Sequence, residues 1–120
     1  MIRTPTSLRV VAACAGLLLA SSAHAIDGAE WRRLPAAARA AYVTGTVDAW
    51  SGLVDVQASL GRNEPAITVF RDIVACVRDR LLPYAQIVAI VERYVAENPG
   101  RSSTEMPDLI FAALGQECRK

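Results

Sequence analysis

The sequence predicts an all-α fold, a small bundle of four to five helices with one disulfide. Apolar residues recur at spacings near 3.6 between Pro and Gly residues, and no segment alternates strictly between apolar and polar residues. β-branched residues are common between Ile67 and Val77 and between Ile87 and Val95, which favours strands, but the helical spacing outweighs them. No repeat or linker divides residues 26–120, so we expect a single helical domain there.

Residues 1–25 have the layout of a secretory signal peptide. Arg3 and Arg9 precede an apolar stretch, Val10–Ala20, which is much shorter than the roughly 20 residues of a membrane-spanning helix. Small residues at Ala23 and Ala25 suit a signal peptidase. We therefore expect cleavage after Ala25 and a periplasmic chain that begins at Ile26.

Two other interpretations of this segment stay open. Cys14 follows Val-Ala-Ala and loosely resembles a lipidation site, although only Val10–Ala13 would then lie between Arg9 and the cysteine. The segment could also remain as an uncleaved N-terminal anchor.

Composition after cleavage argues against most enzymes. Arg3 and Arg9 leave with the signal peptide, so 11 basic residues face 12 acidic ones, interspersed, which does not favour a nucleic-acid partner. His24, the only histidine, is lost as well, and with it the catalytic arrangements that need one. The carboxylates are dispersed and no phosphate loop is present. We expect no enzyme, no metal and no cofactor, and no membrane contact after cleavage.

The first element is a short helical turn, Gly28–Leu34, that Asp27 can cap. Trp31 on this turn has two interpretations, a contact for a binding partner or a core residue.

A long helix follows from Ala36 to about Ser59, with Pro35 suited to its start. Gly45 within it is interpreted as a point where another helix approaches closely, and Trp50 as a core residue. The expected apolar stripe consists of Ala38, Tyr42, Ala49, Leu53 and Val56.

Asn63 is expected to cap the second long helix, with Pro65 in its first turn. Its apolar stripe is Ile67, Phe70, Val74, Val77 and Leu81. Pro83 then opens a third helix that ends at Asn98–Gly100 and is apolar enough to be the central one, with Tyr84 as a packing residue at its start. Its apolar face is Ile87, Val88, Val91, Tyr94 and Val95.

A capping-box pattern, Ser102-x-x-Glu105, predicts the start of the last helix. Its stripe is Met106, Leu109, Ile110, Ala113 and Leu114, and Cys118 lies on the same face.

Two cysteines, Cys76 and Cys118, remain after cleavage and suggest one disulfide in an oxidising compartment. Closing this loop would stabilise the fold by at most about 4 kcal/mol in the chain-entropy model. The alternative is a pair of buried free thiols.

Three residues are candidate partner contacts. Trp31 is one, and Arg62 and Arg101 lie in the connections Gly61–Glu64 and Asn98–Ser103. Both connections also read as simple solvated loops.

The order of several weak motifs resembles the Rap/Tai family of type VI secretion immunity proteins. The matching elements are Tyr42-Val43-x-Gly45, Cys76, Gln86-x-Val88, Val91-x-x-Tyr94-Val95, Asn98-Pro99, Leu109-Ile110-x-Ala112-Ala113-Leu114 and Cys118. The chain departs from the family at Ala40-Ala41, where many members have a further cysteine, and at Pro83, where the family's proline lies closer to the middle cysteine.

The resemblance implies a small all-α periplasmic protein, often dimeric, that binds a cell-wall amidase effector and blocks its active site. It also implies a bridge between Cys76 and Cys118, and it assigns no inhibitory residue. Other functions that fit the chain are a periplasmic acid-stress chaperone, which loosens as carboxylates protonate, and another small envelope binding protein.

Overall fold

The computed structural model describes residues 24–120, so the predicted signal peptide lies outside the described residues except for His24 and Ala25. The elements in order are α2 (Gly28–Arg33), α3 (Ala36–Ser59), α4 (Pro65–Asp79), α5 (Tyr84–Glu97), the short 3-10 helix η1 (Pro99–Arg101) and α6 (Met106–Cys118). A disulfide joins Cys76 to Cys118. The predicted all-α fold with one disulfide is confirmed.

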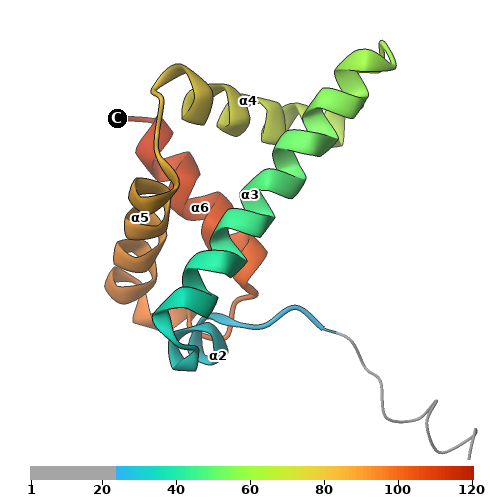
Figure 1. Ribbon diagram of the computed structural model, residues 1–120. Helices are drawn as coiled ribbons and strands as arrows, with labels where there is room; N and C mark the ends of the chain where they lie inside the picture. The colour runs from blue at the N-terminus through green and yellow to red at the C-terminus, as the bar shows by residue number, and fades with distance from the viewer. Residues whose placement is uncertain (1–23) are drawn as a thin grey trace, which may run out of the picture.

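The four long helices form a closed ring in which each packs against two others. α3 contacts α4 and α5, and α6 contacts the same two helices from the other side, while α2 packs on α6. Figure 1 shows α3 crossing the molecule and projecting beyond it, with α4 returning from its far end. The expectation that the third long helix, α5, is the central one was wrong: it is one member of the ring, and α6 buries more residues.

The core inside the ring is entirely apolar. No buried polar or charged residue occurs within residues 24–120. Its members come from all five α-helices and are Trp31, Val43, Val47, Ile73, Ile87, Ile90, Val91, Val95, Met106, Leu109, Ile110, Ala113 and Leu114.

The start of the described chain is tied to the start of α6. The Met106 amide donates to the Ile26 carbonyl at 2.8 Å, and the Gly28 amide donates to Thr104 at 3.1 Å. Gly28 permits this approach, because an added Cβ would lie 2.9 Å from the Leu109 side chain.

Of the three predicted helix caps, one is confirmed and two were wrong. Asp27 caps α2 as predicted and forms a reciprocal box with Glu30, at 2.8 and 2.9 Å. The box predicted from Ser102 to Glu105 does not form, because Ser102 ends η1 and α6 begins only at Met106, after Glu105, which makes no side-chain cap. Asn63 does not cap α4 either, because its side-chain oxygen accepts from Arg71 instead.

The buried face of α3 differs from the predicted stripe. Val43, Val47 and Val54 are buried, whereas Leu53 and Val56 are exposed. Because apolar residues cover more than half of this helix, the pattern alone did not select the face that packs. Gly45 does not mediate a close helix contact, since an added Cβ there would meet nothing within 4 Å.

The disulfide links the last turns of α4 and α6, with Cα atoms 6.1 Å apart. Among residues 24–120, no helix is both long and apolar enough to cross a membrane.

Candidate protein-binding surfaces

Trp31 is a core residue and not a surface contact. Its side chain is 1% exposed, and its indole N–H donates to the Arg39 carbonyl oxygen at 3.3 Å. The interpretation of Trp31 as a partner contact was therefore wrong, because α2 turns it toward α6 and the ring interior.

The two arginine candidates are exposed but are not brought together. Arg62 lies in the α3–α4 connection, and its backbone amide donates to the Gln57 carbonyl at 3.0 Å. Arg101 lies in η1, with its guanidinium 2.5 Å from the Tyr94 hydroxyl and 5.9 Å from that ring's centroid. The α3–α4 connection and η1 are at different ends of the molecule (Figure 1).

A more prominent surface feature is Leu81, which follows the end of α4. Its side chain is 86% exposed, the highest value among the large hydrophobic residues that are exposed. The predicted stripe placed Leu81 on the buried face of the helix, and this was wrong because α4 ends at Asp79.

The backbone at Leu81 is in the left-handed region, with φ of 52°. The Leu82 amide donates to Val77 and the Leu81 amide donates to Arg78, both at 3.1 Å, which are the two bonds of a Schellman cap. Glycine normally takes the left-handed position of this cap, since a side chain there costs about 1–2 kcal/mol.

The end of α3 shows the same cap with the usual residue. Arg62 donates to Gln57 at 3.0 Å and Gly61 donates to Ala58 at 3.1 Å, and Gly61 has φ of 62°. One molecule thus uses glycine at one such cap and an exposed leucine at the other. The cap alone does not require leucine at position 81.

Arg80 fixes the connection that carries Leu81. Its guanidinium donates to the Glu117 carbonyl at 3.1 Å and to the Cys118 carbonyl at 3.3 Å, and its amide donates to Cys76 at 3.0 Å. The α4 end is therefore held to the α6 end by these bonds as well as by the disulfide. Leu81 is presented by a rigid support.

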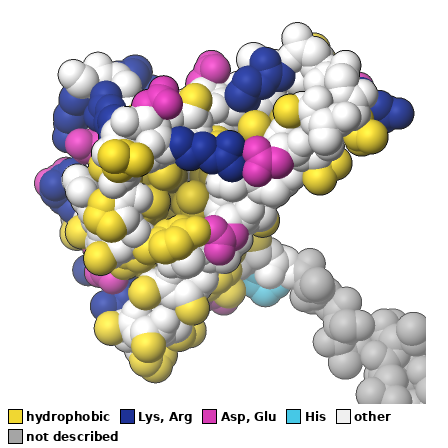
Figure 2. Space-filling model, turned by 45° about the horizontal axis from the view of Figure 1, so that its top comes forward, with side chains coloured by type: hydrophobic (Ala, Val, Ile, Leu, Met, Phe, Trp, Pro, Cys, Tyr) yellow, Lys and Arg dark blue, Asp and Glu magenta, His cyan; other side chains and the backbone are white. Residues whose placement is uncertain are grey.

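A hollow of about 560 Å³ lies beside Leu81, between α3, α4 and α5. In the view of Figure 2, hydrophobic side chains gather in a hollow that basic and acidic side chains flank. The residues that line it are Val47, Asp48, Ser51, Val77, Arg78, Leu81, Leu82, Tyr84 and Ile87. We call Leu81 and this hollow together the Leu81 face.

Two polar side chains of the Leu81 face, Arg78 and Tyr84, are bonded to acidic residues of α3. Arg78 donates two hydrogen bonds to Asp55 at 2.9 and 3.0 Å, which hold the pKa of that carboxyl below its usual value. The Tyr84 hydroxyl donates to Asp48, and this bond raises the pKa of Tyr84. Tyr84 is half-exposed and bonded to α3, so it does more than pack at the start of α5.

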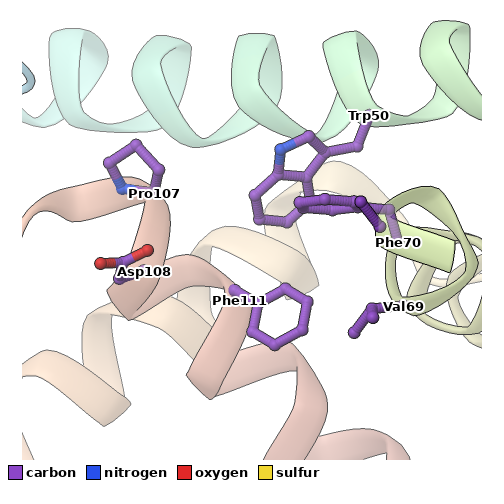
Figure 3. Close-up of a pocket in the computed structure, with 7 residues that line it drawn as sticks. Trp50, Val69, Phe70, Pro107, Asp108 and Phe111 are labelled. Atoms are coloured by element: carbon purple, nitrogen blue, oxygen red, sulfur yellow. The ribbon is translucent and has the colours of Figure 1, made fainter.

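A second apolar surface lies nearer the first turn of α4. Three rings meet there: the Trp50 centroid is 5.2 Å from Phe70 and 6.2 Å from Phe111, and the two phenylalanines are 5.6 Å apart. They line a pocket of about 300 Å³ together with Ala66, Val69, Pro107 and Asp108 (Figure 3). Trp50 is partly buried and packs against the core, which agrees with its interpretation as a core residue, while the rest of its ring lines this pocket.

Neither surface contains a metal-binding cluster. Within residues 24–120, no three His, Cys, Asp or Glu side chains gather to hold an ion. No protein-family model, curated protein or solved structure matches the chain.

Proposed function

We propose that this chain is a periplasmic immunity-type protein that binds and inhibits a cell-wall amidase effector of a type VI secretion system. It is exported by its signal peptide, cleaved after Ala25, and has no enzymatic activity of its own. The motif order described above supports the choice of effector class.

The observation that carries a binding function is the leucine at position 81. An exposed leucine in a conformation that favours glycine lowers the stability of the fold, and such local strain clusters at functional sites. A backbone that is already held in place needs little further ordering when its side chain binds, which favours affinity. Leu81 is therefore the proposed anchor, and a pocket of the effector is its receptor.

The polar pairs of the Leu81 face support recognition over catalysis. Arg78 is bonded to Asp55 and Tyr84 to Asp48, so these groups already have partners around the hollow. They are placed to form the polar rim that surrounds an apolar anchor in a protein interface.

The test is inhibition of the amidase effector from the same cell, assayed on peptidoglycan with the oxidised protein. We expect stoichiometric inhibition. Leu81→Gly should weaken it about 30-fold, the loss of a hot spot worth about 2 kcal/mol. Leu60→Ala, which removes another exposed leucine, is the matched control and should stay within about twofold.

Two outcomes would count against this proposal. If the protein in molar excess leaves the amidase fully active, the inhibitory function is wrong. If Leu81→Gly inhibits as well as the parent protein, the anchor is wrong.

The proposal includes the dimer that the family resemblance implies. Leu53 and Val56 are exposed along the projecting part of α3 and offer an apolar surface for a second copy. Sedimentation velocity should show a dimer that Val56→Lys converts to a monomer. A monomer for the parent protein would contradict this part of the proposal.

An acid-stress chaperone is the second candidate, because ion pairs join neighbouring helices. Asp55 pairs with Arg78 between α3 and α4, and Glu117 pairs with Arg93 between α6 and α5. Lys120 and Arg93 lower the pKa of Glu117, and Arg78 lowers the pKa of Asp55, so both links are lost as the pH falls through these lowered pKa values. Suppression of client aggregation at low pH, without inhibition of any amidase, would favour this candidate.

A further inference from the structure

The aromatic pocket is formed by three helices and is separate from the Leu81 face. α4 and α6 are joined at their last turns by the disulfide, and Trp50 of α3 faces the space between them nearer their first turns (Figure 3). Phe70 comes from α4 and Phe111 from α6, so three helices each supply one ring. This pocket and the Leu81 face have no lining residue in common.

The charge of the pocket has one sign. Asp108, in the first turn of α6, is the only charged residue that lines it, and no side chain of residues 24–120 pairs with its carboxylate. The adjoining part of the groove, toward the disulfide, adds Asp72 and reaches Arg119 only at its far end. The aromatic end is therefore negative.

Aromatic faces carry partial negative charge and attract cations, Arg more often than Lys. A pocket lined by three rings and one acidic residue offers the two contacts that a guanidinium makes best, stacking on a ring and pairing with an oxygen. A volume of about 300 Å³ is at the low end of ligand pockets, which suits one long side chain.

We propose that this pocket receives an arginine or lysine side chain of a protein partner, with the cation over the rings and against Asp108. This inference goes beyond the proposed function, because it assigns a second recognition site of defined chemistry. It can be tested without any effector, so its failure is separate from a failure of the inhibitory function.

The protein carries its own reporters for the test. It has two tryptophans, so a ¹⁵N-labelled sample gives two indole N–H signals, which Trp50→Phe assigns. Trp50 lines the pocket, while the indole of Trp31 is buried and bonded to Arg39. The Trp31 signal therefore reports that each variant is folded.

The probe is acetyl-Ala-Arg-Ala-amide, titrated into the oxidised protein. Its control replaces arginine with citrulline, which has nearly the same shape and no charge. We expect the arginine peptide to shift the Trp50 signal at millimolar concentration, to leave the Trp31 signal in place, and to bind at least about fivefold more tightly than the citrulline peptide.

Asp108→Asn should reduce that preference to within about twofold, since the ring contacts remain and the carboxylate is lost. Asp79→Asn removes an exposed charge at the far end of α4 and should leave the preference unchanged. Equal binding of the two peptides, or no shift of the Trp50 signal up to about 20 mM, a concentration well above expected millimolar affinity, would overturn the proposal.

Discussion

Arg39 holds Trp31 from two sides. Its backbone carbonyl accepts the indole N–H at 3.3 Å, and its guanidinium lies 5.7 Å from the centroid of the indole ring. The same guanidinium donates to Leu34 at 2.8 Å and to Glu92 at 3.0 Å. One side chain thus joins the α2–α3 connection to α5.

Arg39→Met should lower the free energy of unfolding by about 1–2 kcal/mol, because the Leu34 carbonyl loses a charged donor and Trp31 loses its cation. Urea denaturation measures this change. Glu92→Gln is the control, and a cost above about 1 kcal/mol there would mean that the partly exposed ion pair, and not the bond to Leu34, dominates.

Two glycines should respond in opposite directions to alanine. Gly28→Ala should destabilise the fold by about 1–3 kcal/mol, since its Cβ would lie 2.9 Å from Leu109. Gly45→Ala should stabilise it by about 0.5–1 kcal/mol, because its Cβ meets open space within a helix. Thermal denaturation of both variants checks this, and equal shifts in Tm would contradict the packing of α2 on α6.

Leu81→Gly should raise the free energy of unfolding by about 0.5–1 kcal/mol. The change relieves a side chain at φ of 52°, and the greater freedom of glycine in the unfolded chain offsets part of the gain. Gly61→Leu at the equivalent cap of α3 is the mirror experiment and should destabilise by about 1–2 kcal/mol. A stability loss in Leu81→Gly would show that Leu81 serves the fold.

Replacing Cys76 and Cys118 together with serine should cost about 2–4 kcal/mol, because the bridge closes a loop with a sequence separation of 42 residues. The ends of α4 and α6 would keep only the bonds from Arg80. Urea denaturation of the variant and of the reduced parent should agree. A cost below about 1 kcal/mol would mean that the bridge strains the folded state.

Acid should weaken the link between α3 and α4. The pKa of Asp55 is lowered by Arg78 in the folded state, so the pair stabilises the fold above the ordinary pKa of Asp, 3.8, and this contribution is lost as the pH falls through the lowered pKa. A ¹³C titration of the Asp55 carboxyl should give a pKa below 3.8. Arg78→Met should bring it back to the ordinary value, and an unchanged pKa in that variant would contradict the assigned cause.

Much of the fold was predictable from local signals. The five helices, the Asp27 cap and the disulfide follow from spacing, turn residues and cysteine count. The packing faces were harder, because α3 is apolar around more than half its circumference and only the positions of α4 and α5 decide that Val47 is buried and Leu53 is exposed. The Ser102 box failed because Ser102 ends η1 and α6 starts only at Met106.

Neither candidate surface was predicted. In the sequence, Leu81 simply continues the predicted apolar stripe of α4. Only the position of the last turn of α4 shows that this leucine occupies the position that glycine normally takes in a Schellman cap. The signal that could have found it is the pair Leu81-Leu82 immediately before Pro83. The aromatic pocket has no local signal, because its three rings come from positions 50, 70 and 111.

The bonds between Ile26–Ala29 and Ser102–Met106 make the native structure depend on contacts between distant parts of the sequence. Residues at the start of the domain form backbone hydrogen bonds with one of its last segments, and the disulfide of Cys76 requires Cys118. During synthesis the N-terminal part therefore has no complete core to join until nearly the whole chain has emerged. The fold is therefore completed only when the two ends of the domain are both present.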